Sequence, residues 1–325
     1  MGKENEKLIE IKTNDVCKIA LPNTKTKVVE MGNVIELTWQ DHQPGAPVCE
    51  KIDKDHYMDK RTGEVFDIQH WETRADGKKS IRKTMETIRA LINTNVVEPR
   101  NCLWCTFTYA DNMTDEKQLY VDFKVFKNRF NHYCRGRGLP QPEYISVIEP
   151  QGRGAWHIHA FFIWQDAAPY IDNNTVMEKL WPHGFTKTKA VKETDNVGAY
   201  FTAYLADIPL DEAENLENEN RQKILAMSED AVLKEFEDEK GLTKKKKFIK
   251  GGRLCLYPPG MNIVRYSRGI VKPIVEYMPY EQAEKKATAA TVTFERSYIV
   301  ADEHGVVNTI SKAYYNTKRK ANQDK

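Results

Sequence analysis

The stretch GAWHIHAFFIW, residues 154–164, places two histidines inside the most apolar run of the chain. Strand-forming aromatic and aliphatic residues surround them, and the turn-forming sequence QGRG, residues 151–154, precedes them. Alternate residues of a strand point to opposite faces, so His157 and His159 are predicted to share one face. Each buried imidazole needs a polar partner, and two neighbouring imidazoles can offer two nitrogens to one metal ion.

A third ligand is expected from the preceding strand. PEYISVIEP, residues 142–150, predicts a strand that pairs with the histidine strand as a hairpin, and Glu149 stands beside the turn. Two imidazoles and one carboxylate form a mixed site that suits Mn²⁺, and Mg²⁺ less well because imidazole is a softer ligand than water or carboxylate. The sequence therefore predicts that Glu149, His157 and His159 bind a divalent metal; hydrogen-bonded core histidines are the alternative.

The segments around the hairpin predict the order β-α-β-β-α-β-α. Hairpin pairing implies an α+β fold with a central, largely antiparallel sheet flanked by helices. A strand is expected first, then a long helix capped by Thr114, and after the hairpin a short helix, a strand and a last helix. In order, the predicted segments outside the hairpin span residues 102–110, 114–135, 175–181, 184–191 and 196–207.

Composition divides the rest of the chain. Acidic residues dominate residues 207–240, whereas residues 241–272 contain no Asp or Glu and nine Lys and Arg. This basic segment is either a binding surface for phosphates or a solvated loop. Short strands and a helix over 79–94 are predicted near the start. We therefore expect an N-terminal extension of open role, a central metal-binding domain, an acidic helical spacer and a basic C-terminal extension that contacts DNA. These four parts span residues 1–95, 96–210, 211–243 and 244–325.

Composition also excludes several classes of protein. Six scattered cysteines in 325 residues do not form a disulfide scaffold. CLWC, residues 102–105, has the spacing of a zinc knuckle, but no second pair follows, so a buried strand with two thiols is favoured. No window approaches the ~20 apolar residues of a membrane span, and the charged start lacks a signal peptide. A cytoplasmic location without membrane contact is expected.

The last predicted helix, NVGAYFTAYLAD (residues 196–207), carries two tyrosines. Tyr200 and Tyr204 are four residues apart and therefore lie on one helix face. Packing against the sheet is one explanation for them. The other is chemical, because a tyrosine hydroxyl beside a metal-held phosphate is a nucleophile that would form a phosphotyrosine and free a 3′-hydroxyl on DNA.

Three segments together resemble the motifs of the HUH endonucleases, and within them the rolling-circle replication initiators of bacterial plasmids, integrative elements and phages. They are TFTY (106–109), WHIHAFF (156–162) and NVGAYFTAYLAD (196–207). The resemblance covers roughly residues 100–210, and residues 250–273 are similar to a segment that follows the nuclease domain in initiators from Gram-positive hosts. It implies an RRM-like nuclease fold with N- and C-terminal extensions.

The resemblance implies roles for single residues. His157 and His159 would be the paired metal ligands, Glu149 the acid that completes the site, and Tyr204, ahead of Tyr200, the nucleophile. The helix lacks the family's usual lysines, so another cation must lower the pKa of the tyrosine. The candidates for this, and for contacting DNA, are Arg153, Lys187, Lys189, Lys250 and Arg253.

The implied activity is metal-dependent nicking and rejoining of single-stranded DNA at a replication origin through a 5′-phosphotyrosine. The chain contains no Walker-type loop, so a host helicase is expected to unwind the origin and a host polymerase to extend the free 3′ end. Two alternatives stay open. One is a small-molecule metalloenzyme, such as an oxygenase, that uses the two histidines. The other is a protein that only binds DNA, with an inactive catalytic helix.

Overall fold

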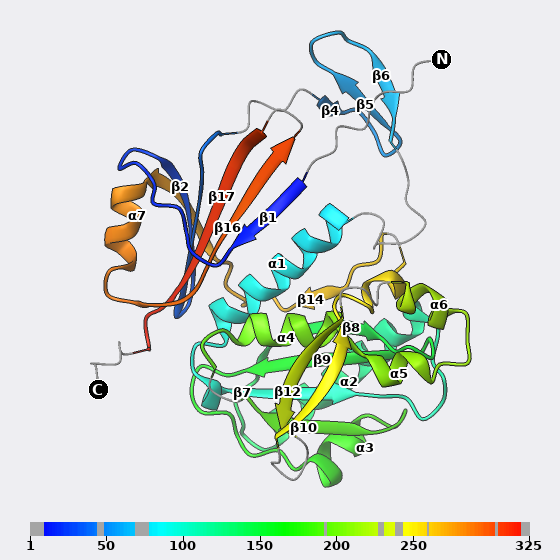
Figure 1. Cartoon of the computed structure of the whole chain (residues 1–325). Helices are drawn as coiled ribbons and strands as arrows, with labels where there is room; N and C mark the ends of the chain where they lie inside the picture. Colours follow the sequence, from blue (N-terminus) through cyan, green and yellow to red (C-terminus); the bar gives the residue numbers. More distant parts are fainter. Residues whose placement is uncertain are drawn as a thin grey trace. The chain divides into compact units, whose positions relative to one another are not determined.

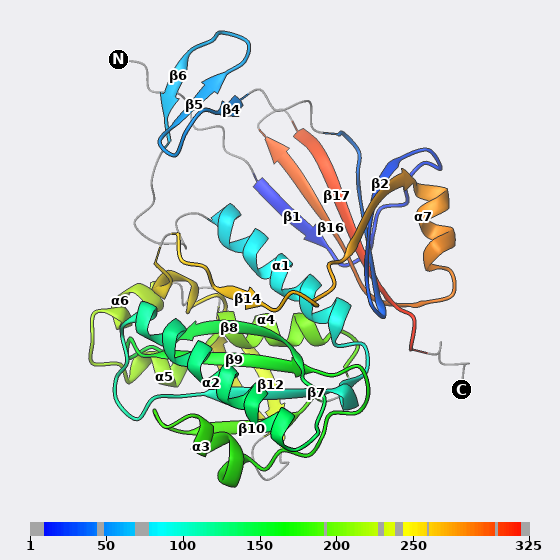
Figure 2. The same cartoon turned by 180° about the vertical axis from the view of Figure 1, so that it is seen from behind.

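A computed structural model gives the fold. It describes residues 10–43, 49–68, 78–191, 194–226, 231–237, 243–258, 260–302 and 305–319. The chain forms two compact units (Figures 1 and 2). Residues 1–70 and 273–325 form the first unit, and residues 71–272 form the second. Both units combine antiparallel strands with helices, which confirms the predicted α+β class.

The second unit is built on a five-stranded antiparallel sheet in the order β10-β7-β9-β8-β14. Strands β8 and β9 form the predicted hairpin, and β14 adds an edge strand from the basic segment. The sheet has two edges and is not a closed barrel. Its strands are β7 (Cys102–Phe107), β8 (Glu143–Pro150), β9 (Trp156–Ile163), β10 (Thr186–Ala190) and β14 (Val264–Tyr266).

Helix α2 (Glu116–Gly136) covers one face of this sheet (Figure 2). A stripe of its aromatic side chains is buried in the core. Its buried residues include Leu119, Phe123, Phe126 and Phe130, as their helical spacing predicts. The predicted cap was wrong by one residue. Asp115, not Thr114, caps the helix, because its carboxylate accepts hydrogen bonds from two backbone N–H groups of the first turn.

Helices α1 (Lys78–Asn95) and α4 (Val197–Ala206) pack on each other. Asn93 of α1 accepts a hydrogen bond from the backbone N–H of Gly198 at 2.8 Å. An added Cβ at Gly198 would lie 2.4 Å from the carbonyl oxygen of Arg89, so only glycine allows this close approach. Helix α1 therefore fixes the position of the helix that carries the tyrosines, although the sequence analysis assigned it to a separate N-terminal extension.

The acidic segment is only partly the helical spacer that was expected. Its first half forms two short helices, whereas its second half is a strand that pairs with the lysine-rich strand β13. Ala213 and Ile224 lie fully buried beside Ile208 and Ile249, so apolar residues between the acids give this segment a small core. The elements are β11 (Ile208–Pro209), α5 (Leu210–Glu214), α6 (Asn220–Leu225), β12 (Ala231–Glu237) and β13 (Thr243–Ile249). Short helical turns elsewhere are η1 (Pro99–Asn101), η2 (Asn173–Met177), α3 (Glu178–Leu180) and η4 (Leu254–Leu256).

The first unit combines strands from both ends of the chain in a six-stranded sheet, in the order β1-β16-β17-β3-β2-β15. Helix α7 (Tyr280–Ala287) packs on this sheet, and β4, β5 and β6 form a separate small sheet. The strands are β1 (Glu10–Asn14), β2 (Lys25–Met31), β3 (Val34–Gln40), β4 (Cys49–Lys51), β5 (His56–Asp59), β6 (Val65–Asp67), β15 (Ile274–Pro279), β16 (Thr291–Asp302) and β17 (Gly305–Asn316).

Gly198→Ala tests the close contact between α1 and α4. The added methyl group collides with a backbone oxygen that cannot rotate away, so we expect a loss of about 1–3 kcal/mol of unfolding free energy. Thermal unfolding followed by circular dichroism measures it. Gly136→Ala is the matched control, because nothing lies within 4 Å of its added Cβ, and its Tm should be equal to or slightly above that of the parent. Equal Tm values for both variants would contradict the tight contact.

Candidate functional site

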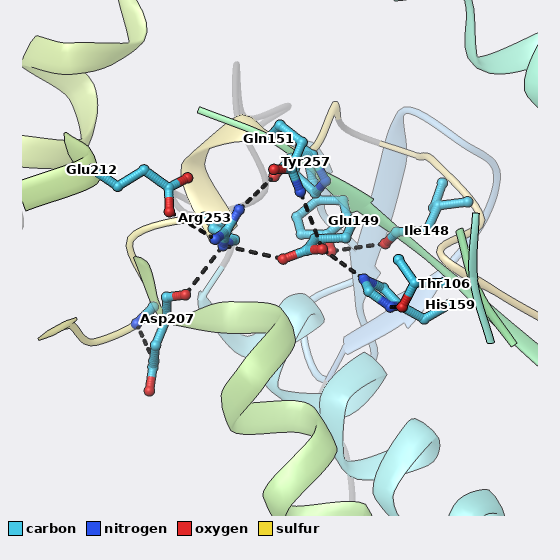
Figure 3. A network of polar contacts seen from close by, with 11 residues as sticks. Thr106, Ile148, Glu149, Gln151, His159, Asp207, Glu212, Arg253 and Tyr257 are labelled. Atoms are coloured by element: carbon cyan, nitrogen blue, oxygen red, sulfur yellow. Dashed lines mark hydrogen bonds and ion pairs between the residues drawn. The ribbon is translucent and has the colours of Figure 1, made fainter. Parts of the chain in front are cut away.

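The site is centred on a buried carboxylate–imidazole pair. Strand pairing sets Glu149 opposite His157 and Val147 opposite His159, so the acid and both histidines point to one face of the sheet. His159 is fully buried, and its Nε2 lies 2.6 Å from Oε2 of Glu149 (Figure 3). Its Nδ1 lies 3.1 Å from the Thr106 hydroxyl on the neighbouring strand. Each nitrogen of the ring therefore has a polar partner.

Arg253 holds the other oxygen of the carboxylate. Its Nε lies 3.2 Å from Oε1 of Glu149, and both side chains are almost completely buried (Figure 3). Burial alone would raise the pKa of Glu149, but the positive charge of Arg253 and the bond to His159 outweigh it, so the pKa of this carboxyl is lowered. Glu149 is therefore an ionised carboxylate that lies below the protein surface at neutral pH.

Arg253 also connects the hairpin to the end of α4. Its guanidinium donates to the carbonyl oxygens of Asp207 at 3.1 Å and Pro150 at 3.3 Å, and approaches Glu212 at 3.5 Å. Its backbone N–H donates to the carbonyl oxygen of Ala206 in the last turn of α4. Sequence analysis named Arg253 as a DNA contact or as a cation near the tyrosine. The structure places its guanidinium among protein groups.

His157 is a neutral imidazole at physiological pH. Burial lowers its pKa to about 4, against the opposing effect of Glu149. A neutral ring keeps a lone pair that can bind a metal ion. Thr106 supports the same role for His159, because its hydroxyl can donate to Nδ1 or accept from it, depending on which ring nitrogen carries the proton.

The donor atoms fit a divalent ion by kind and by position on the sheet. They are two imidazoles and a carboxylate on one face, with a hydrogen-bonded second partner behind His159. Among the described residues, however, no group of three His, Cys, Asp or Glu side chains has the arrangement needed to hold a metal ion. Glu149 contacts His159 directly at 2.6 Å, so binding an ion between them requires this hydrogen bond to open.

Both tyrosines lie on the same side of the sheet as the histidines. The ring centroid of Tyr204 is 5.4 Å from that of His159, and both tyrosine rings meet the indole of Trp104 edge to face. Tyr204 is 48% exposed and Tyr200 is 58% exposed, so each can meet a ligand from solvent. Partial burial, and then the charge of Glu149, raise the pKa of Tyr204 to about 12, while Arg253 opposes this rise.

The other predicted cations lie at the margins of this face. Lys187 and Lys189 stand opposite Thr106 and Trp104 in the strand register, and both are exposed. Arg153 is exposed in the hairpin turn and is close enough to lower the pKa of His157. Lys250 is exposed just after β13.

Trp156, Tyr257 and Tyr266 differ in whether their rings are exposed enough to stack on bases. Trp156 and Tyr257 are buried, and the Tyr257 hydroxyl donates to the carbonyl oxygen of Ile148 at 2.9 Å, so both belong to the core. Tyr266 is 41% exposed and keeps a ring available for stacking.

Cys102, Cys105 and His183 can bind metals by residue type, but none of them joins the site. Cys102 and Cys105 lie three positions apart on one strand and therefore point to opposite faces, which rules out a shared zinc ion. His183 packs against Trp181 and Tyr109 and approaches Asp122 at 3.7 Å. Trp181 contacts the aromatic residues beneath α2, so His183 lies on the other side of the sheet from His159.

The fold and the site define an α+β protein with a buried Glu–His–Arg cluster below a helix that carries two exposed tyrosines. Residues 102–208, about a third of the chain, match the model of the family described as replication-associated protein ORF2/G2P. This match supports a role in replication initiation of the rolling-circle type. No curated protein and no solved structure matches the chain. No helix in the described part of the chain is long and apolar enough to span a membrane.

The pKa of His157 predicts a specific pH dependence of stability. Between pH 6.5 and 4 the unfolded chain protonates this histidine while the folded protein does not, so stability falls as pH falls through this range. The expected loss is about 1–3 kcal/mol. Urea unfolding in EDTA at pH 7, 5.5 and 4 measures it. His157→Gln should flatten the curve, whereas His132→Gln, at an exposed position on α2, should leave it unchanged. Parallel curves for all three proteins would contradict the assignment.

Proposed function

We propose that this protein initiates rolling-circle replication by nicking and rejoining single-stranded DNA, with Tyr204 as the first nucleophile. The contact between the rings of Tyr204 and His159 carries this proposal, because it sets the nucleophile beside the predicted phosphate-binding centre. The family match over residues 102–208 supports it, since that range includes both tyrosines, both histidines and Glu149.

Glu149, His157 and His159 would hold the divalent ion, Mn²⁺ or Mg²⁺, which would polarise and orient the scissile phosphate. Tyr204 then attacks the phosphorus in line. A bond forms between its phenolic oxygen and the phosphorus, and the bond to the 3′-oxygen breaks. The phenolic proton is lost and the leaving 3′-oxygen gains one, so the products are a 5′-phosphotyrosine and a free 3′-hydroxyl that a polymerase can extend.

The surroundings of Tyr204 keep it neutral until the reaction begins. With a pKa of about 12, only ~1 in 10⁵ of these side chains is ionised at pH 7. The helix offers no lysine to lower this pKa, and position 203 is Ala203. Arg253 supplies one positive charge that acts on Tyr204, although Glu149 balances much of it. The bound ion must therefore contribute most of the activation.

Tyr200 can serve the second transfer. It lies one helical turn before Tyr204, and its ring also meets the indole ring of Trp104 edge to face. A phosphotyrosine conserves the energy of the phosphodiester bond, so attack on it by a new 3′-hydroxyl rejoins the strand without ATP. Two tyrosines on one helix face would allow one to hold a 5′ end while the other cleaves.

The exposed cations would guide the DNA strand across this face. Four of them border the site and can neutralise phosphates: Lys187, Lys189, Arg153 and Lys250. A host helicase would supply unwound origin DNA. Of the two alternatives, an oxygenase that carries its paired histidines on a closed all-β barrel does not fit this sheet, which is open and flanked by helices. A protein that only binds DNA would differ from a nicking enzyme in forming no covalent bond to the DNA.

A denaturing gel tests the covalent step. The protein is mixed with Mn²⁺ and 3′-labelled single-stranded oligonucleotides that cover the DNA flanking its gene. We expect a shifted, label-carrying band that Tyr204→Phe reduces at least tenfold and that the double variant Tyr200→Phe, Tyr204→Phe abolishes. Tyr170→Phe, at a tyrosine that is 86% exposed and lies outside the helices and strands, is the control and should give the parental band. Binding without any covalent band would leave the protein a DNA-binding protein only.

Removing the metal ligands tests the ion. His157→Ala with His159→Ala should lower the rate of adduct formation by about 10²–10³, because several kcal/mol of charge stabilisation depend on the ion and each 1.36 kcal/mol is tenfold. Isothermal titration with Mn²⁺ gives a second measurement that does not need activity, and the same variant should lose the binding heat. His132→Ala is the control. Full adduct formation in EDTA would exclude a role for the metal.

A further inference from the structure

The six-stranded sheet of the first unit has two chemically different faces. Helix α7 covers one of them, where Val28, Leu37 and Ala313 lie side by side in the register and pack with Ala283 and Ala287. Residues next to these in each strand point to the opposite face. The strand register therefore identifies the side chains of the second face without reference to any ligand.

On the second face, one row of directly paired residues crosses five strands. Arg296 pairs with Lys312, Lys312 with Thr38, Thr38 with Lys27, and Lys27 with Tyr277. Three of these five residues are cationic and the row ends in an aromatic ring. Tyr277 is 63% exposed. The row spans four inter-strand spacings and is therefore about 19 Å long.

Aromatic rings and cations are paired on this face. Lys25 lies over the ring of Tyr277 at 5.1 Å, and Arg296 lies over the ring of Phe294 at 5.3 Å. A third pair, formed by Lys312 and the ring of Tyr314 at 5.5 Å, lies in the middle of the sheet. Phe294 is 36% exposed and packs on Tyr314. Tyr314 is buried, so the pairs at Tyr277 and Phe294 are the two that offer rings and cations, the groups that stack on bases and contact phosphates of single-stranded nucleic acids.

Charge separates the two faces further. The face beneath α7 carries Glu30 and Glu276, which both bind Lys286 of that helix. On the second face Glu36 binds Lys312 and Asp15 binds Arg296, both at 2.8 Å. Lys25 and Lys27 add positive charge near the exposed ring of Tyr277. An anionic ligand is therefore favoured on the second face and disfavoured on the first.

We propose that this second face binds single-stranded nucleic acid, with Tyr277 and Phe294 stacking bases and Lys25 and Lys27 contacting phosphates. A sheet face with exposed rings suits separated bases, which present their π-faces, better than a duplex, whose bases are stacked on one another. The proposal concerns the first unit alone and does not depend on nicking by the second. It gives the extensions at the two ends of the chain a common function.

The test uses the full chain in EDTA, with Tyr200→Phe and Tyr204→Phe present throughout so that no covalent step contributes. Fluorescence anisotropy measures the Kd for a labelled 20-mer of thymidine. Adding Tyr277→Ala and Phe294→Ala should weaken binding at least tenfold, since a stacked base loses its platform at each position. The conservative changes Tyr277→Phe and Phe294→Tyr should restore affinity to within about threefold. Lys25→Ala with Lys27→Ala should lower the slope of log Kd against log salt concentration.

Two variants on other surfaces serve as controls, and photocrosslinking gives a second measurement. Tyr170→Ala and Lys285→Ala remove an exposed ring and an exposed cation from other surfaces and should leave the Kd unchanged. Photocrosslinking of the parental protein to iodouracil-substituted DNA should label peptides that contain Tyr277 or Phe294, whether or not the alanine variants fold. Equal affinity of the alanine variants, crosslinks confined to residues 102–208, or equal binding of a duplex of the same length would each overturn the proposal. A matched uridine 20-mer shows whether DNA or RNA is preferred.

Discussion

The buried carboxylate of Glu149 is the constraint on which the site depends. A carboxylate that is 2% exposed would cost several kcal/mol if it were unpaired. His159 and Arg253 each take one of its oxygens, and both are buried with it. Removing Arg253 would leave a buried negative charge without a cation, and removing His159 would break the short hydrogen bond to its other oxygen. The positions of the two partners are therefore fixed by the need to neutralise one acid.

This constraint extends to the helix of the tyrosines. Arg253 bonds to the backbone at the end of α4 as well as to Glu149, so the last turn of α4 is tied to the hairpin that carries the histidines. At its other end, α4 meets α1 through Asn93 and Gly198. The helix is held at both ends over the sheet. The ring of Tyr204 can consequently stay in contact with His159 without being buried in the core.

Local patterns predicted much of this domain, because they depend on periodicity alone. The alternation in β9 predicted that both histidines share one face, and the spacing of Phe123, Phe126 and Phe130 predicted the buried side of α2. Periodicity could not identify the other residues of the site. Arg253 lies 104 positions after Glu149, and strand alternation would have indicated Thr106 only once the pairing of β7 with β9 was known. Nor could local sequence show that the two ends of the chain share a sheet.

The balance of charge in the site explains why the proposed chemistry requires a divalent ion. Arg253 already neutralises Glu149, and His157 is neutral at pH 7. A phosphodiester adds one negative charge and an ionised Tyr204 adds a second, in surroundings that already raise the pKa of that tyrosine to about 12. Neither charge has a buried cation left to pair with in the cluster of Figure 3. In the proposed mechanism, one doubly charged ion beside the imidazoles would offset both negative charges, so the ion and not the DNA would lower the pKa of the tyrosine.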